Sequence, residues 1–186
     1  MSYLNKQQRE QQILEVAKKI ALNEGLNTLT VRKIAIAAEI SVGQVHHHFN
    51  SISELKAQAF LDLAYQNIAE IHQIEDSDVI ANLMQVFGLE DNNIPYIRLW
   101  NSAESMSLND PIMKAAYKKA LFHWHSVVCE WLQRSQHSLK KTDIEGMAWR
   151  LTAVCYGFEN LYNLGFHDLD FYNLQIKTAI QEIIGH

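Results

Sequence analysis

The chain has 186 residues, of which 48% are hydrophobic, and its net charge is −5. A chain of this length buries about 70% of the surface that it exposes when unfolded, which fits one or two domains. Its first residues are polar and no apolar run approaches the ~18 residues of a membrane helix, which excludes a membrane-spanning chain. Two cysteines without a signal sequence favour a cytoplasmic location, with Cys129 and Cys155 reduced and buried; a redox-sensing pair is the alternative.

The charge is unevenly divided along the chain. Residues 1–50 hold six Lys and Arg and four Asp and Glu, a balance of +2, whereas residues 51–186 hold ten and seventeen, a balance of −7. Binding to DNA depends on local contacts to phosphates rather than on the charge of the whole chain. A mildly basic first part on an acidic remainder restricts which surface can approach DNA.

The first predicted helix spans residues 5–24. Its apolar residues recur at helical spacing and are Ile13, Leu14, Ala17, Ile20 and Ala21. Gly25 follows, where a glycine in the left-handed helical conformation commonly ends a helix.

Two short helices with a tight joint follow within residues 30–49. Thr30 is a good N-cap for the first, whose apolar stripe consists of Val31, Ile34, Ala35 and Ala38. Ser41 is a good N-cap for the second, which places Val45 and Phe49 on its inner face. Its other face carries Val42, Gly43, Gln44, His46 and His47. This pattern predicts a helix-turn-helix whose second helix enters the major groove of DNA.

These residues resemble the DNA-binding module of the tetracycline-repressor (TetR/AcrR) family of bacterial regulators. The resemblance covers about the first third of the chain and includes Gly25, Thr30-Val31-Arg32-Lys33-Ile34-Ala35, Ile40-Ser41-Val42-Gly43-Gln44-Val45-His46-His47-His48-Phe49 and Ser53-Glu54-Leu55. It departs from the family at Ile52, where a basic residue is usual, and at Lys33, where an acid is usual. Over the remainder, the resemblance rests on the number and length of the helices.

Six further helices are predicted. They span about 51–71, 79–87, 95 onward, 112–136, 142–165 and 170–184, with a capping box at Ser51 to Glu54 and caps at Asp110 and Thr142. No segment shows the period-two alternation of a strand. We therefore expect an all-α protein of about nine helices, with a DNA-binding domain at 1–60 and an effector-binding and dimerisation domain at 61–186.

The predicted DNA contacts are Thr30, Arg32, Lys33, Ser41, Val42, Gly43, Gln44, His46, His47 and His48. Gln44 can bond bidentately to adenine, Val42 can touch a thymine methyl group, and Gly43 lets the backbone come close. Thr30, Arg32 and Ser41 lie at helix N-termini, where backbone N–H groups attract phosphate. The resemblance implies that His46 stands where a tyrosine usually touches a phosphate.

The triple histidine also invites a metal interpretation, but consecutive helical residues point about 100° apart and cannot converge on one ion. We expect no metal and no cofactor. If the histidines contact phosphate, protonation should raise DNA affinity as the pH falls from about 8 to 6, which a DNA titration would test.

The resemblance implies a small-molecule pocket in the later helices. We expect apolar walls from Tyr96, Trp100, Trp124 and Phe158, and polar groups from Glu104 and His125. An acid beside aromatic rings suits a cationic or amine ligand. The alternatives are that the aromatic residues form only core, and that Glu104 pairs with Arg98 or Lys114.

The last two helices carry wide apolar faces, and the resemblance implies a two-fold dimer. The predicted interface residues are Leu151, Cys155, Leu161, Leu174, Ile180 and Ile183. A dimer places two recognition helices about 34 Å apart, the spacing that reads a palindrome.

No glycine-rich phosphate loop, Ser/His/Asp arrangement or pair of catalytic carboxylates is present, so we do not expect an enzyme. The sequence favours a transcriptional regulator, a repressor that binds a palindromic operator as a homodimer and is released by a small molecule. The alternatives are an effector-independent DNA-binding protein and a helical protein that binds small molecules but not DNA.

Overall fold

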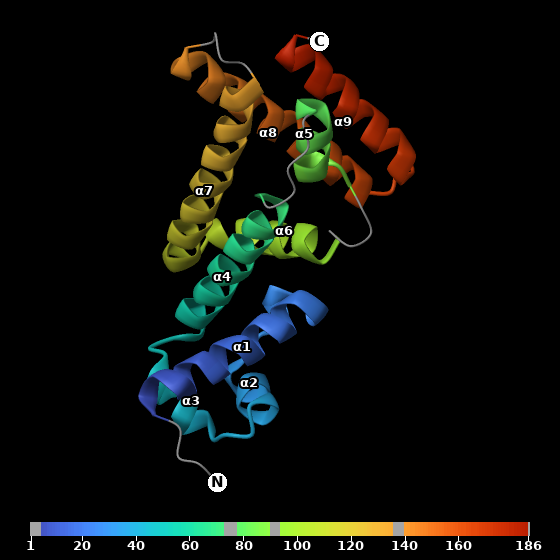
Figure 1. Ribbon diagram of the computed structural model, residues 1–186. Helices are drawn as coiled ribbons and strands as arrows, with labels where there is room; N and C mark the ends of the chain where they lie inside the picture. Colours follow the sequence, from blue (N-terminus) through green and yellow to red (C-terminus); the bar gives the residue numbers. More distant parts are fainter. Residues whose placement is uncertain (1–4, 73–77, 90–93, 136–139, 186) are drawn as a thin grey trace. The chain divides into compact units, whose positions relative to one another are not determined.

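The computed structural model describes residues 5–72, 78–89, 94–135 and 140–185, and over these ranges it contains nine α-helices and no strand (Figure 1). The all-α prediction is confirmed. The elements are α1 (Lys6–Glu24), η1 (Leu26–Thr28), α2 (Val31–Ala37), α3 (Val42–His48), α4 (Ile52–His72), α5 (Val79–Phe87), α6 (Ile94–Ser107), α7 (Pro111–Ser135), α8 (Lys141–Asn163) and α9 (Leu169–Ile184). Within the described part, no helix has the length and apolar character needed to cross a membrane.

The chain forms two compact units, each made of two segments. Unit 1 comprises residues 1–66 and 95–120, and unit 2 comprises residues 67–94 and 121–186. Helices α4 and α7 each contribute to both units. The functional boundary at residue 60 remains a prediction. In the packing, residues 95–120 belong to the same unit as the helix-turn-helix segment.

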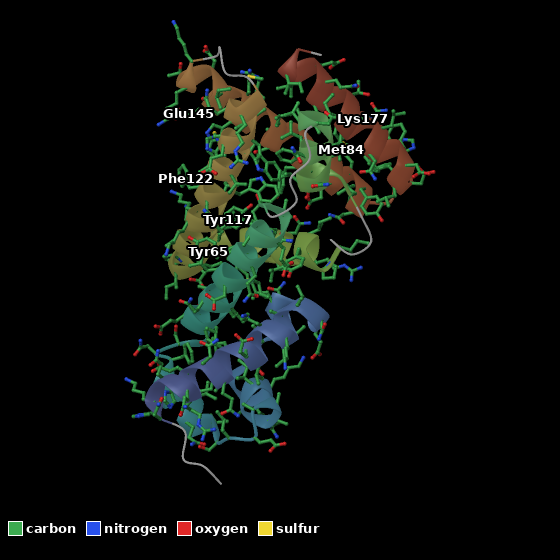
Figure 2. All side chains as sticks on the ribbon, in the orientation of Figure 1. Tyr65, Met84, Tyr117, Phe122, Glu145 and Lys177 are labelled. Carbon is green, nitrogen blue, oxygen red and sulfur yellow. The ribbon has the colours of Figure 1, made fainter. Side chains whose placement is uncertain are left out.

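Unit 1 has a single hydrophobic core that continues from the helix-turn-helix into α4, α6 and α7. Ile13, Ile34 and Leu55 are completely buried, and Leu99 and Met113 belong to the same cluster. Three rings pack together beside it: the centroid of Phe60 lies 5.2 Å from Trp100 and 6.0 Å from Tyr117. Tyr117 and Tyr65 are labelled in Figure 2, on α7 and α4.

Unit 2 is built around the antiparallel pair α8 and α9, with α5 packed on α9 (Figure 1). Leu132, Leu151 and Ile176 are completely buried in it. Asn173 on α9 holds the chain after α5, because its side chain accepts from the backbone N–H of Leu89 at 2.7 Å and donates to the carbonyl of Leu89 at 2.8 Å.

Some predicted helix ends differ from the structure. Thr142 was expected to cap α8, but α8 begins at Lys141 after the N-cap Lys140, which makes no side-chain cap bond. The N-cap of α9 is Asp168, whose side chain accepts from Phe171 N, so α9 starts one residue before the predicted Asp170. Gly25 has φ 97° and ψ 146°, an extended conformation with positive φ rather than the left-handed helical one. The predicted residues 76–77, 90–93 and 136–139 lie outside the described part.

Candidate nucleic-acid interface

The caps of α2 and α3 are formed by the predicted side chains. The Thr30 hydroxyl accepts from Lys33 N at 3.2 Å, and the Ser41 hydroxyl accepts from Gln44 N at 3.2 Å. Each cap satisfies a backbone donor that the helix leaves unpaired. Between the helices, Glu39 has φ 56°, the single non-glycine residue with positive φ in the described ranges. This left-handed residue turns the chain sharply between α2 and α3.

Helix α3 presents one inner and one outer face, as its sequence predicts. Val45 is only 1% exposed and belongs to the core of unit 1. Val42, Gly43, Gln44, His46 and His47 are all exposed. No atom but the Ser41 hydroxyl lies within 4 Å of a Cβ built on Gly43, so the surface there is open. The outer face can therefore approach a flat or grooved partner without moving the core.

Gln44 closes a capping box, which changes its expected role. Its side-chain oxygen accepts from Ser41 N at 3.1 Å, while its own N–H donates to the Ser41 hydroxyl. The amide oxygen is therefore engaged with the backbone, and the Nε2 group is the part of the amide left to donate outward. A bidentate bond to adenine needs both the oxygen and the nitrogen. In this conformation, Gln44 suits a base-edge acceptor instead.

The three histidines do not share one environment. His46 and His47 are exposed, whereas the side chain of His48 is only 8% exposed. Its Nδ1 lies 3.4 Å from Oε1 of Glu10 on α1, and its ring meets that of His47 edge to face at 5.2 Å. The side chain of His48 therefore packs against α1 and does not lie on the exposed face of α3, where it was predicted. No group of three metal-ligating side chains occurs among the described residues.

Two basic residues of α2, Arg32 and Lys33, also differ in their surroundings. Arg32 on α2 is exposed and forms no ion pair with any residue that the structure describes. Lys33 pairs instead with Glu24 at the end of α1, with Nζ 2.6 Å from Oε2. Arg32 is thus available to a phosphate, while Lys33 would first have to leave Glu24.

The joint between α3 and α4 is tied by Glu54. Its carboxylate accepts from the backbone N–H of Asn50 at 2.8 Å and from the Asn50 side chain at 2.9 Å, and the Ser51 hydroxyl accepts from Glu54 N. The predicted capping box at Ser51 is thus half formed, because Glu54 reaches Asn50, one residue further back. Ile52 is half-buried against the core of unit 1, which explains an apolar residue at this place.

These features match a known family. The model of "bacterial regulatory proteins, tetR family" matches residues 13–59, which span the last part of α1 through the first part of α4. Over residues 13–59, the chain is thus similar to the regulators of this family. The members of this family are DNA-binding transcriptional regulators, and the matched residues include all of α2 and α3. By sequence alone, no curated protein matches the chain.

The fold of the chain is shared by solved structures of low sequence identity. One is described as a transcriptional regulator from Saccharomonospora viridis in complex with choline: 19% identity, 95% of each chain covered, TM-score 0.70. The multidrug binding protein EbrR, complexed with proflavin, has 17% identity, 94% of this chain and 99% of its own covered, and TM-score 0.72. A chain described as a TetR-family regulator from Mesorhizobium loti has 11% identity, 98% of each covered, and TM-score 0.75.

The six residues predicted to bind an effector fall into two groups. Tyr96, Trp100 and Glu104 lie on α6 in unit 1, and Trp124, His125 and Phe158 lie on α7 and α8 in unit 2. Within unit 1, Trp100 packs against the fully buried Phe60. Within unit 2, Trp124 meets Phe87 edge to face at 5.8 Å, and Phe158 lies 6.3 Å from Tyr172.

His125 makes several contacts within unit 2. Its ring stacks on Trp149 with centroids 4.1 Å apart, and its Nε2 lies 3.3 Å from the carbonyl oxygen of Glu145. The Cys129 thiol lies 3.7 Å from Nδ1 of the same ring. Burial raises the pKa of Cys129, with a further contribution from Glu145, and the thiol is therefore kept protonated.

The residues predicted for a dimer interface also divide by burial. Leu151, Cys155 and Ile180 are at most 4% exposed and face the core of unit 2, so they offer almost no surface to a second chain. Leu161 and Leu174 are 43% and 60% exposed, and Ile183 is half-buried. Phe171, on the apolar face of α9, is exposed as well, and so are Leu164 and Phe166, which no helix pattern in the sequence had indicated.

Proposed function

We propose that this chain is a ligand-responsive repressor that binds a palindromic operator as a homodimer and acts in the cytoplasm. The observation that carries the proposal is the outer face of α3, where Val42, Gly43, Gln44, His46 and His47 are exposed on a capped helix whose inner face is core. Seven helical residues reach only a few base pairs, so sequence recognition needs a second copy of the helix.

An apolar surface on unit 2 supports the homodimer. The end of α8, the following turn and the start of α9 expose five large apolar side chains: Leu161, Leu164, Phe166, Phe171 and Leu174. We call this set the α8–α9 apolar patch. Several large apolar side chains in one stretch are typical of a surface that a partner covers. An isologous contact between two copies would cover the patch on both chains.

A small-molecule effector is supported by the polar groups that unit 1 and unit 2 leave unsatisfied. Oδ1 of Asn101 on α6 and Oε1 of Gln85 on α5 are buried and have no hydrogen-bond partner among the described residues. A buried acceptor without a partner costs free energy, so a ligand that donates a hydrogen bond would be favoured at either of these two atoms. The structures that share this fold include complexes with choline and with proflavin. We therefore propose a donor-bearing or cationic effector that prefers a conformation with the two DNA-binding modules wrongly spaced.

Selection from a random pool of DNA duplexes tests the proposal. The wild-type chain should enrich a palindrome whose half-sites lie about one helical turn apart. The double variant Gln44→Ala, His47→Ala should bind the selected duplex at least about tenfold more weakly, since it removes two outward groups of α3. Gln133→Ala, an exposed glutamine on α7, is the matched control and should bind as the wild type does. Enrichment of no sequence would contradict the proposal.

A further inference from the structure

Unit 1 contains a polar contact that links α7 to the beginning of α4. The hydroxyl of Ser53, in the first turn of α4, donates to Oδ2 of Asp110, which precedes α7 by one residue. The two residues are 57 positions apart in the sequence. The contact is half-buried and lies beside the core of unit 1, to which Leu55 and Met113 both contribute fully buried side chains.

Asp110 is held in place independently of Ser53. Its other carboxylate oxygen, Oδ1, accepts from Ile112 N at 2.9 Å and from Met113 N at 3.2 Å, so Asp110 caps α7. The hydrogen bond from Ser53 is the main cause that lowers the pKa of Asp110; the two backbone donors and the charge of Lys56 act in the same direction. Asp110 is therefore an ionised acceptor that is fixed to the first turn of α7.

The contact continues toward α3 through residues already described. Ser53 is followed directly by Glu54, whose carboxylate binds the backbone and the side chain of Asn50. Asn50 is two residues beyond the end of α3 at His48. The hydroxyl of Ser51 accepts from Glu54 N and completes the joint. A displacement of Ser53 would therefore move the end of α3 as well.

We infer that Ser53 and Asp110 are positioning residues for DNA binding, which fix the DNA-contacting helix α3 against α7 through the first turn of α4. Neither residue touches the outer face of α3. The inference rests on the proposed function, because it concerns how firmly α3 is held for an operator. Without the contact, α3 has more orientations relative to α7, and binding must select one of them.

Ser53→Ala is the decisive variant, because it removes the hydroxyl and leaves the caps of α4 and α7 intact. Its dissociation constant for the duplex selected by the wild type should rise about three- to tenfold at fixed salt, the range expected for one hydrogen bond. Ser53→Thr keeps the hydroxyl and should restore most of the affinity. Ser105→Ala, an exposed serine of α6 in the same unit, is the matched control.

Two measurements separate positioning from general stability. The melting temperature of every variant must lie well above the assay temperature, so that all chains are folded when affinity is measured. Without DNA, amide hydrogen exchange of α3 should be faster in Ser53→Ala than in Ser105→Ala. The double variant Ser53→Ala, Asp110→Asn should bind no more weakly than the weaker of the two single variants, because both act through one contact.

The outcomes distinguish this inference from the proposed function. If the wild type selects no duplex, both fail. If the wild type binds and Ser53→Ala binds within twofold of it, or if the effects of the two single variants multiply, the positioning role fails and the proposed function stands.

Discussion

The side-chain oxygen of Gln44 accepts a hydrogen bond from the backbone N–H of Ser41, 3.1 Å away, at the start of α3. The same side chain thus stabilises the N-terminus of the helix and stands on its outer face. Glutamate fills this place in a capping box as well as glutamine does. The two roles of Gln44 can therefore be separated by substitution.

Gln44→Glu should preserve the stability of α3 but weaken DNA binding. A carboxylate still accepts from Ser41 N, but it has no donor for a base edge and adds a negative charge near phosphates. We expect the free energy of unfolding to change by less than about 0.5 kcal/mol and the DNA affinity to fall at least about tenfold. Gln44→Ala should lose both stability and affinity. Chemical denaturation and fluorescence anisotropy measure the two effects; unchanged affinity in Gln44→Glu would show that Nε2 does not contact DNA.

Glu39→Gly should stabilise the chain. Glu39 has φ 56°, a conformation that glycine adopts without the steric cost of a Cβ atom. We expect a gain of about 1 kcal/mol in the free energy of unfolding, measured by urea denaturation. Ala37→Gly, two residues earlier and still in α2, is the opposite control and should lose about 0.5–1 kcal/mol. A loss of stability in Glu39→Gly would indicate that the Glu39 side chain itself contributes a contact.

The contribution of Asp110 to stability should disappear in acid. Its pKa is lowered from an ordinary value of 3.8. A lowered carboxyl pKa stabilises the folded chain above the unfolded-state value, and this stabilisation is lost as the pH falls through the folded-state value. The difference in unfolding free energy between the wild type and Asp110→Asn, which retains a cap, should thus be constant from pH 7 to about 5 and shrink below about pH 4. A difference that does not change with pH would contradict the ionised pairing.

Both thiols should react slowly in the folded chain. Burial raises the pKa of Cys155 to about 12 and raises that of Cys129 as well, so little thiolate exists near neutral pH. An aromatic disulfide reagent at pH 8 should modify Cys155 at least about a hundredfold more slowly than it does in urea. Cys155→Ser identifies which phase belongs to which thiol. Rapid modification of both residues would instead support a redox-sensing pair.

Leu174→Glu should weaken self-association if the α8–α9 apolar patch is the dimer interface. Leu174 is 60% exposed in the single chain, and a buried unpaired carboxylate at an interface is costly. Sedimentation equilibrium should show a dimer for the wild type and a shift toward monomer for the variant. Leu108→Glu is the matched control, because Leu108 is 77% exposed but lies outside the patch. A dimer that tolerates Leu174→Glu would place the interface elsewhere.

Local features of the fold could be predicted from the sequence, and features that depend on distant residues could not. Thr30, Ser41 and Asp110 cap helices through donors two or three residues away, so their role is visible in a short window. His48 was expected on the DNA face, but its partner Glu10 is 38 residues away. The burial of Leu151 depends on the packing of other helices, which no periodicity reveals.

The same division between local and distant features applies to the candidate nucleic-acid interface. The exposed residues of α3 follow from one amphipathic helix and its cap. The engagement of Lys33 with Glu24 follows from the end of α1 lying beside α2, which a single helix pattern does not contain. The contact between Ser53 and Asp110 joins residues 57 positions apart, so neither helix start predicts it by itself.

The core of unit 1 draws on two separate stretches of the chain. Phe60 is completely covered, and its ring neighbours Trp100 and Tyr117 come from residues 95–120. A fragment that ends at residue 66 would lack both ring neighbours of Phe60 and would expose an apolar surface to solvent. A chimera that joins the helix-turn-helix segment to another protein should therefore include α6 and the first turns of α7.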